Sequence, residues 1–587
     1  MSRKFTADFE TSTLSWYLRD SYARVWAWAL FEIGSENGFS YGNDLTEFMK
    51  ILANPRENYV LYFHNLKFDG EYIFNWLLQN GFSYVKNKKE RRDKTFTCLI
   101  TDTGQFYSIE IWFEIKGRHT NKVTIYDSLK ILNFGVDYIA SKKGFNLPIQ
   151  KLKLDYDTYR PVGHFLTEHE VAYIRNDVEV MARALKIMFD KKLDKMTIAS
   201  NSLSFYKTTI QDFNYFFPNI GNNKDEIVRK SYKGGWTYLN PLYKNVHVKK
   251  GIVIDKNSMY PSHMHDDLLP CGEPEFFNGK YKEDKTYSLY IQALTCSFKL
   301  KPGKLPTIQL KHNPAYKDNE YICDTEGRIE SLTLTSVDLD LFFEHYDVDV
   351  ISWDCGYKFK AIKGLFNNYI DYWMNEKIEG QKEGSMARRT IAKLMLNSLY
   401  GKFGTNPLFR SKYPYIKDDG SVGYHLNESE IKDTIYCPVA SFITSYARAD
   451  IIRCSQAVRD YSIKKYGEDY YIYSDTDSIH CKELSEEELS AIMEIDDYKL
   501  GAYKVESKFS EGKFIRQKCY VEVDYDGKIN STIAGCPKKL SKYINLKNFD
   551  TGFSIAANDT NYEDKKLTFK HVKGGVILVP TDFTIKE

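Results

Sequence analysis

Short acidic motifs recur next to apolar, strand-like runs at widely separated points of this 587-residue chain. Asp8-Phe9-Glu10 ends a run that starts at Phe5, Asp255 closes Ile252-Val253-Ile254, and Asp475-Thr476-Asp477 interrupts a run of aromatic and β-branched residues. Carboxylates beside apolar neighbours are costly unless something pairs them. A divalent cation is their natural partner, so the fold is expected to bring these distant acids together around such cations.

The first acidic set predicts a centre for phosphodiester hydrolysis. Residues i and i+2 of a strand share a face, and Tyr173 and Asp177 lie one turn apart on a helix predicted for residues 168–188, with Thr167 as its N-cap. Four acids could hold two cations about 3.5–4 Å apart, with Tyr173 orienting the attacking water and Lys151 neutralising the developing charge. The alternatives are that Asp8 and Glu10 lie on a solvated edge strand and that Lys151 is a solvated surface lysine. The four acids are Asp8, Glu10, Asp69 and Asp177.

The second acidic set predicts a centre for nucleotidyl transfer. Asp475-Thr476-Asp477 lies in the turn of a strand–turn–strand predicted for residues 469–481, and its alternative is an ordinary Asx-type turn. Paired with Asp255, it suggests two cations, of which one would activate a 3′-hydroxyl and the other would hold a triphosphate.

A helical run at residues 389–401 supplies candidate phosphate ligands. Arg389, Lys393 and Asn397 are spaced i, i+4 and i+8, and Tyr400 follows Lys393 by seven residues, so all four share one helix face. The alternative is an amphipathic helix with a solvated basic face. The functional interpretation is that Arg389 and Lys393 bind a triphosphate and that Tyr400 packs on the incoming base.

Composition narrows the class of protein. The net charge of +2 excludes a uniformly basic surface, so DNA binding needs a local basic channel, with an affinity that falls steeply with salt. The ten cysteines form no C-x-x-C, which favours a reducing compartment. We find no Walker A loop, G-x-G-x-x-G or H-E-x-x-H motif, no signal peptide, and no uncharged apolar run of about 18 residues.

The pattern of apolar residues predicts several regions of different texture. The first 190 residues alternate strand-like and helical runs, as in an α/β domain, and a glycine-containing loop spans 231–236. Residues 267–364 are rich in prolines and β-like stretches, 364–399 are helical with a break near 379–384, and 411–426 form a hairpin. A helix follows at 441–461, and the tail from about 537 is β-rich.

These residues together resemble the family B DNA polymerases that carry an N-terminal proofreading exonuclease. Residues 255–261 are similar to motif A (D-x-x-S-L-Y-P, with Met259 for Leu), 393–401 to motif B (K-x-x-x-N-S-x-Y-G) and 473–477 to motif C (Y-x-D-T-D). Residues 8–10, 65–69 and 173–177 are similar to the three exonuclease motifs. The chain is shorter than most cellular family B enzymes. Elements of the protein-primed subgroup are similar to residues 232–235, to Thr444 with Arg448, and to residues 518–520.

The resemblance implies an α/β and α+β multidomain fold, with an RNase H-like 3′-5′ exonuclease domain and a right-hand polymerase carrying two palm insertions. The implied boundaries are 1–197 for the exonuclease, 198–266 and 433–536 for the palm, 365–404 for the fingers and 537–587 for the thumb. The insertions are 267–364, the terminal-protein region 1, and 405–432, the terminal-protein region 2.

The resemblance also implies a role for each matching residue. Asp255 and Asp477 bind two Mg²⁺, which Mn²⁺ can replace, with Asp475 nearby, and Asp8, Glu10, Asp69 and Asp177 bind two more. Tyr260 excludes a 2′-hydroxyl. Lys377 is a weaker candidate for a phosphate ligand, because the segment from Trp373 to Lys393 is about four residues longer than in the family. The implied nucleotide ligands are Tyr260, Arg389, Lys393, Asn397, Tyr400 and Lys377, and the implied DNA ligands are Thr11, Tyr62, Asn65, Phe68, Ser128, Leu129, Tyr232, Gly234, Gly235, Thr444, Arg448, Lys518 and Tyr520.

The implied partners are a DNA template, a primer strand, deoxynucleoside triphosphates (dNTPs), a terminal protein that primes synthesis, and single- and double-stranded DNA-binding replication proteins. A monomer in the cytoplasm of a bacterial host, without membrane contact, is expected to copy a linear phage genome processively with strand displacement. Two alternatives remain open: a family B polymerase that extends only nucleic-acid primers, and a DNA-binding protein with vestigial active sites. The intact acids argue against the second.

Overall fold

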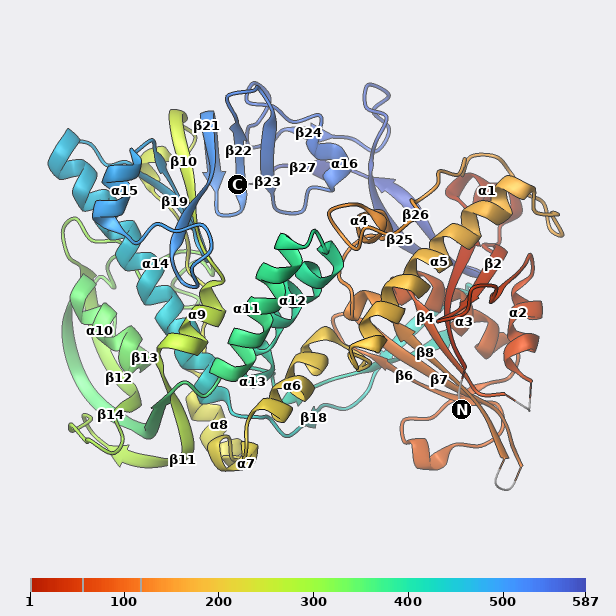
Figure 1. The fold of residues 1–587 in the computed structure, drawn as a ribbon, viewed down its shortest axis with the longest axis horizontal. Helices are drawn as coiled ribbons and strands as arrows, with labels where there is room; N and C mark the ends of the chain where they lie inside the picture. Colours follow the sequence, from red (N-terminus) through yellow and green to blue (C-terminus); the bar gives the residue numbers. More distant parts are fainter. Residues whose placement is uncertain (1–2, 55–56, 117–118, 587) are drawn as a thin grey trace.

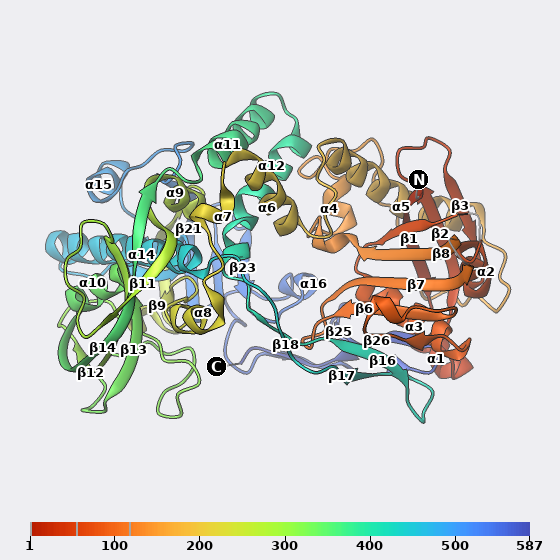
Figure 2. The same ribbon diagram turned by 90° about the horizontal axis from the view of Figure 1, so that it is seen from below.

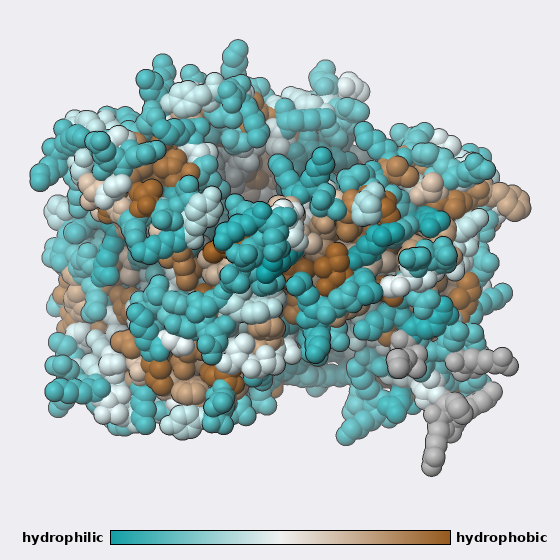
Figure 3. Space-filling model, in the orientation of Figure 1, coloured by the Kyte–Doolittle hydropathy of each residue, from teal (hydrophilic) through white to brown (hydrophobic). Residues whose placement is uncertain are grey.

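The computed structural model describes residues 3–54, 57–116 and 119–586. Figure 1 shows an N-terminal lobe and a second lobe, with the helices of residues 198–209 and 367–398 between them. Hydrophilic residues cover most of the face seen in Figure 3. Within the described ranges, no helix is both long and apolar enough to cross a lipid bilayer.

The N-terminal lobe is built on an eight-stranded sheet of order β3-β2-β1-β4-β8-β7-β6-β5, in which β1 pairs in parallel with β4, and β4 with β8. Helices α2 and α3 pack on one face, and α5 packs on the other. The strands are β1 Arg3–Thr11, β2 Val25–Glu32, β3 Phe39–Gly42, β4 Tyr59–Phe63, β5 Ser83–Tyr84, β6 Thr95–Ile100, β7 Phe106–Lys116 and β8 His119–Asp127. The helices are α1 Leu14–Asp20, α2 Leu45–Leu52, α3 Leu66–Gln79, α4 Val136–Ala140 and α5 Glu168–Asp190.

Strand alternation decides where the first acidic motif points. Phe5, Ala7 and Phe9 are buried in the core shared with α3, whereas the Thr6 hydroxyl donates to the backbone carbonyl of Val178 in α5 at 2.7 Å. Because successive side chains alternate, Asp8 and Glu10 face α5 as well. The predicted α5 start is confirmed, because the Thr167 side chain accepts from the Glu170 backbone N–H and closes a capping box.

The second lobe is built on a seven-stranded sheet of order β23-β22-β21-β10-β20-β19-β9. The long helix α14 (Cys437–Tyr466) packs against it and extends the predicted helix at 441–461 in both directions. The strands are β9 Thr237–Leu239, β10 His247–Lys256, β19 Tyr471–Asp475, β20 Ser478–Lys482, β21 Tyr503–Arg516, β22 Cys519–Val523 and β23 Ile529–Ile533, and the nearby helices are α8 Gly221–Arg229, α9 Met259–Asp266 and α15 Glu486–Ile492.

Further segments surround these two sheets. Residues 268–363 contain a four-stranded sheet of order β11-β14-β12-β13, and the predicted hairpin at 411–426 is present as β16 and β17. Their elements are β11 Leu268–Asn278, β12 Leu289–Leu300, β13 Glu330–Thr335, α10 Ser336–His345, β14 Tyr346–Lys363, β15 Leu408–Phe409, β16 Lys412–Ile416, β17 Val422–Leu426 and β18 Glu430–Ile431. The C-terminal elements are α16 Lys538–Ser541, β24 Ser554–Ile555, β25 Lys566–Val572, β26 Gly575–Thr581 and β27 Phe583–Thr584.

The helices between the lobes are α6 Ile198–Thr209, α7 Phe213–Phe216, α11 Asn367–Lys382, α12 Met386–Ser398 and α13 Tyr400–Phe403. The predicted break near 379–384 lies slightly later, because α11 continues to Lys382 and Gly384 turns the chain at φ +70°. Gly380 does not end the helix. A Cβ there would lie 2.8 Å from the backbone nitrogen of Arg389, so its small size allows α11 and α12 to approach closely.

Three distant segments meet at one buried carboxylate on the N-terminal lobe. Glu71 of α3 accepts from the Tyr424 hydroxyl of β17 at 2.8 Å and lies 3.0 Å from Nε2 of His571 in β25. Nearby, the Tyr72 hydroxyl donates to the backbone carbonyl of Val576 at 2.6 Å. Figure 2 shows β16, β17, β25 and β26 running along this lobe. The hairpin and the C-terminal strands are thus tied to the N-terminal sheet.

We expect Glu71→Ala to loosen this junction. The Tyr424 hydroxyl would lose its buried acceptor, at a cost of about 3 kcal/mol in the free energy of unfolding. Urea unfolding and limited proteolysis at residues 412–426 measure the effect. Glu71→Gln, which keeps an acceptor, is the matched control and should lose less. Equal stability of Glu71→Ala and the parent protein would contradict this role.

Candidate active sites

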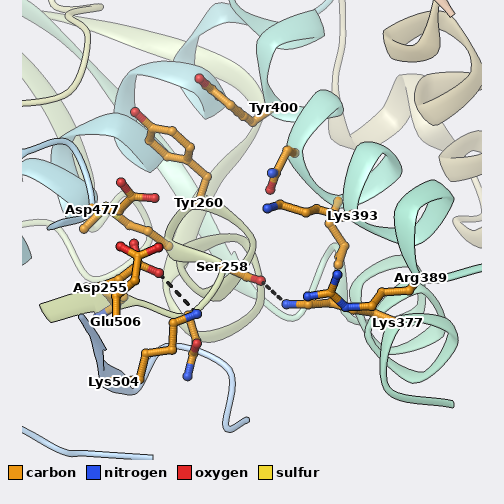
Figure 4. Close-up of a pocket in the computed structure, with 15 residues that line it drawn as sticks. Asp255, Ser258, Tyr260, Lys377, Arg389, Lys393, Tyr400, Asp477, Lys504 and Glu506 are labelled. Carbon is orange, nitrogen blue, oxygen red and sulfur yellow. Dashed lines mark hydrogen bonds and ion pairs between the residues drawn. The ribbon is translucent and has the colours of Figure 1, made fainter. Parts of the chain in front are cut away.

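A cavity of about 380 Å³ lies between the seven-stranded sheet and the helices α11 and α12. Figure 4 shows carboxylates on the sheet side of this central cavity and cations on the helix side. The lining includes Asp255, Ser258, Tyr260, Lys377, Arg389, Lys393, Asn397, Tyr400, Asp477, Lys504 and Glu506. Every predicted nucleotide ligand therefore lies around one cavity.

Strand pairing brings the carboxylates of the second acidic set together. Asp255 is near the end of β10, and Asp477 lies in the turn between β19 and β20. Because Asp255 is opposite Ser478, this turn lies beside the end of β10, and the Lys256 backbone N–H donates to the carbonyl of Asp477 at 2.9 Å. Burial and the neighbouring Asp255 raise the pKa of Asp477 to about 6, and burial raises the pKa of Asp255.

The opposite side of the cavity is basic. Arg389 and Lys393 reach it from α12, and Lys377 reaches it from α11, where its Nζ lies 3.2 Å from the Ser258 hydroxyl. Burial and the neighbouring Lys504 lower the pKa of Lys377 to about 8. The buried Nε of Arg389 has no hydrogen-bond partner among the described residues. A polyanion would satisfy these groups.

Two tyrosines stand at the end of the cavity. The ring of Tyr260 in α9 stacks on Tyr400 in α13, with centroids 4.3 Å apart and planes 30° apart. In Figure 4 both rings lie above the carboxylates. This flat pair suits the recognition of a planar base or a sugar.

Asp475 takes a different position from Asp477. Its two carboxylate oxygens are each 3.0 Å from Nζ of Lys518, and Oδ1 accepts from the Thr237 hydroxyl at 3.1 Å. Asp475 does not line the central cavity. Asp475 is flanked by Lys518, in the turn before β22, and by Tyr520 on β22. The ring of Tyr520 packs against that of Tyr473, with centroids 5.3 Å apart. The Asp475 carboxylate is thus bound by Lys518 and Thr237, whereas the Asp477 carboxylate lines the central cavity.

The first acidic set forms a second cluster, in the N-terminal lobe. Ligand atoms of Asp8, Glu10 and Asp177 lie within 4.8 Å of one another, while Asp69 falls outside this group but within electrostatic reach of Asp8. Burial and Asp177 raise the pKa of Asp8 to about 7, and burial raises the pKa of Glu10 and of Asp69 well above the usual range. Nζ of Lys151 is 3.5 Å from Oδ2 of Asp177.

The N-terminal cluster fits divalent cations. Oδ1 of Asp69 and Oδ1 of Asp177 are buried and accept no hydrogen bond from the described residues. Such orphaned oxygens are costly in the absence of a cation. Oxygen donors of this kind are the ligands that Mg²⁺ and Mn²⁺ prefer.

A tyrosine pair completes the N-terminal cluster. The hydroxyl groups of Tyr173 and Tyr156 are 2.7 Å apart, and burial and Glu10 raise the pKa of Tyr173 above its usual range. Tyr156 is 45% exposed, so its outer face is open to a ligand. The sequence analysis missed Tyr156, because its loop carries no motif.

The predicted strand-binding residues of this lobe divide into two groups. Thr11, Asn65, Phe68 and Leu129 are partly exposed. Tyr62 is packed between Tyr126 and Phe189, and the buried Ser128 hydroxyl donates to the carbonyl of Phe63 at 3.0 Å. Tyr62 and Ser128 thus pack within the protein, and their contact with a strand stays a prediction.

The glycine-containing loop lies against the turn that carries Asp477. A Cβ at Gly235 would lie 2.8 Å from the Thr476 side chain, so glycine is needed at this approach. Arg448 donates to the carbonyls of Lys233 at 2.7 Å and Gly234 at 2.8 Å.

Two residues predicted to touch DNA instead face the protein interior. Arg448 is 5% exposed and pairs with the buried Asp338, and the 2% exposed Thr444 bonds back to its own helix. In this structure both side chains bond to protein groups, and their direct contact with DNA stays a prediction. Arg448 holds the loop that carries Gly234 and Gly235, while Tyr232 and Gly234 remain partly exposed.

Two charged residues that β21 contributes to the central cavity were also missed. Glu506 adds a carboxylate beside Asp255 and Asp477, and Lys504 pairs with Asp255 at 3.4 Å. Both lie on β21, and strand register alone brings them to Asp255. The alternation in residues 503–506 marks a strand, but no sequence signal assigns its partner.

We expect the stability of the metal-free protein to depend on pH through Asp8. Its pKa is raised from 3.8 to about 7, so it stabilises the fold below pH 3.8, and this contribution is lost as the pH rises to about 7. In a chelator at pH 8, Asp8→Asn should therefore unfold at a higher temperature than the parent. The difference between the two melting temperatures should grow as the pH rises from 3.8 to about 7. Calorimetry measures it. A difference that shrinks with pH would contradict this electrostatic assignment, and Asp137→Asn serves as an exposed control.

Known proteins match this chain throughout its length. The family model described as DNA polymerase type B, organellar and viral, matches residues 53–493. The chain is 42% identical to the DNA polymerase of Bacillus phage M2 and 40% identical to that of Bacillus phage phi29, with 100% of each chain covered. The solved structure of the phi29 DNA polymerase with primer-template DNA and incoming nucleotide matches with a TM-score of 0.90, 39% identity and 100% coverage of both chains.

The resemblance drawn from the motifs is thereby confirmed. More than half of the chain matches the family model, and the relatives align over their whole length. The α/β multidomain fold agrees with that of the phi29 polymerase. The chain belongs to the type B DNA polymerases of organelles and viruses, in the group of the Bacillus phage phi29 DNA polymerase.

Proposed function

We propose that the central cavity catalyses template-directed addition of dNTPs to a 3′-hydroxyl. The observation that carries this proposal is that Asp255 and Asp477 share one cavity with Arg389 and Lys393 on its opposite side. Two Mg²⁺ held by Asp255 and Asp477 would lower the pKa of the 3′-hydroxyl and neutralise the triphosphate. The resemblance, not a contact in this structure, supports a catalytic role for Asp475.

The cations and aromatic rings of the cavity would select the nucleotide. The triphosphate oxygens would be bound by Arg389, Lys393 and Lys377. The positive charges of these side chains would stabilise the negative charge that develops on the leaving pyrophosphate. Tyr400 and Asn397 would contact the base. Tyr260, stacked on Tyr400, would leave no room for a 2′-hydroxyl and so select deoxynucleotides.

Primer and template would approach from the side of the glycine-containing loop. Lys518 and Tyr520 lie near Asp475 and would hold the primer end. Tyr232, Gly234 and Gly235 would guide single-stranded template between the two acidic clusters, with Arg448 positioning this loop from behind.

For the N-terminal cluster we propose 3′-5′ exonuclease activity. Asp8, Glu10, Asp69 and Asp177 would hold two Mg²⁺ that supply a hydroxide for phosphodiester hydrolysis. Tyr173 would orient the water, and Lys151 would neutralise the developing charge on the phosphate. The partly exposed Thr11, Asn65, Phe68 and Leu129, together with Tyr156, would seat the frayed strand.

The domain boundaries expected from the resemblance remain part of this proposal. They are an exonuclease at 1–197, a palm at 198–266 and 433–536, fingers at 365–404, a thumb at 537–587, and insertions at 267–364 and 405–432. The junction at Glu71 supports a closed path around DNA, because it joins the second insertion and the thumb to the exonuclease. Such closure would favour processive, strand-displacing synthesis.

We further propose that synthesis starts on a terminal protein during replication of a linear phage genome in the cytoplasm of a bacterial host. A monomer would work with single- and double-stranded DNA-binding proteins. The support is full-length similarity to the phi29 polymerase group. The second candidate is a polymerase of the same core that extends only nucleic-acid primers.

Labelling separates these two candidates. The enzyme is incubated with Mg²⁺, all four labelled dNTPs and the proposed terminal protein, without any DNA primer. Covalent label on that protein is expected, and it should be absent with an Asp477→Ala enzyme. If a primed template is extended but the terminal protein stays unlabelled, the second candidate is favoured.

A further inference from the structure

Lys504 occupies an unexpected place among the cations of the central cavity. It lies on β21 directly opposite Asp255, and its Nζ is 3.4 Å from Oδ2 of that residue. Figure 4 shows this pair on the carboxylate side, whereas Arg389 and Lys377 reach the cavity from the helix side. Lys504 is therefore the counter-ion of the carboxylate that would hold a metal ion.

The remaining cations near the cavity have other partners or positions. Lys256 is paired with Asp450, and the ammonium of Lys377 lies against the Ser258 hydroxyl. Arg389 and Lys393 belong to α12, across the cavity from the sheet. Lys504 alone among the cavity-lining cations of the described chain makes an ion pair with one of the cavity-lining carboxylates.

We propose that Lys504 competes with a divalent cation for Asp255 and so sets the ion concentration at which the polymerase site fills. This inference rests on the metal-binding role of Asp255 and Asp477 proposed above. Lys504 is a positioning residue in this scheme, because it acts on the ion through Asp255.

Electrostatics gives the direction of the effect. An ion on Asp255 would face an ammonium group a few ångströms away, so Lys504 must first leave the carboxylate. Its side chain is 33% exposed, which leaves a path to solvent. Breaking a partly exposed pair and separating like charges should weaken ion binding about tenfold.

Manganese binding to the full-length protein tests this without any turnover. The substitutions Asp8→Ala and Asp177→Ala are combined to remove Mn²⁺ binding by the N-terminal cluster. The concentration of free Mn²⁺ is then followed by electron paramagnetic resonance. In this background Lys504→Gln should bind Mn²⁺ about tenfold more tightly than the parent, and Lys504→Arg should bind like the parent. Lys508→Gln is the matched control, because Lys508 lies on the same strand, paired with Glu483 outside the cavity.

The same titration distinguishes two kinds of failure. If Asp255→Asn binds Mn²⁺ as tightly as the parent, the proposed metal site and the function built on it are wrong. If Asp255→Asn loses binding while Lys504→Gln binds no more tightly than the parent, only the inference about Lys504 is overturned. An equal gain in Lys508→Gln would also overturn it, because the effect would then be one of general charge.

Discussion

Asp477→Ala is expected to lower primer extension by at least about 10³-fold while 3′-5′ trimming continues at the parent rate. Asp477 lines the central cavity beside Asp255, and its pKa of about 6 reflects burial next to that second carboxylate. Removing it takes away half of the pair that would hold the ions. The Asp8 cluster lies in the N-terminal lobe, on β1 and α5, and keeps all its ligands.

Gel assays on a labelled primer-template measure both activities of the Asp477→Ala protein. Asp526→Ala, at an exposed acid in the turn after β22, controls for the loss of a negative charge. Unchanged melting temperature shows that the variant is folded. Extension within tenfold of the parent would exclude Asp477 as an essential ligand.

Asp8→Ala is expected to do the reverse: trimming falls by about 10³-fold, and extension is retained. Asp8 shares its cluster with Glu10 and Asp177, whose ligand atoms lie within 4.8 Å of one another. Asp8→Ala removes one of the carboxylates that would hold the ions. Misincorporated ends should then persist.

Trimming of a mismatched single-stranded end, followed with and without dNTPs, measures the Asp8→Ala effect. Asp137→Ala changes an exposed acid of the same lobe and should behave like the parent. Trimming that survives in Asp8→Ala would place hydrolysis elsewhere. If Asp8→Ala and Asp477→Ala both behaved like the parent, both site assignments would be wrong.

The sequence predicted the elements whose signals are local. The alternation around Asp8 and Glu10, the N-cap at Thr167 and the turn at Asp475-Thr476-Asp477 depend on neighbours in the chain, and the structure contains each of them. The helix face that carries Arg389 and Lys393 follows from its periodicity in the same way. Several members of both acidic clusters could therefore be anticipated, although Asp475 does not line the central cavity.

What the sequence could not supply depends on tertiary register and burial. Glu506 and Lys504 reach the cavity only because β21 pairs with β10 in one register. Arg448 looks like a DNA ligand in the motif, but α10 places Asp338 against it and buries the pair. The junction at Glu71 joins segments that no local pattern connects.

The central claim is that two separate acidic clusters bind divalent cations, one for chain growth and one for trimming. Its most direct test is a crystal of the full-length protein with primer-template DNA, an incoming dNTP and Mn²⁺, measured at the manganese absorption edge. The account predicts anomalous peaks between Asp255 and Asp477, and others among Asp8, Glu10 and Asp177. A map without a peak between Asp255 and Asp477, with nucleotide bound, would contradict it.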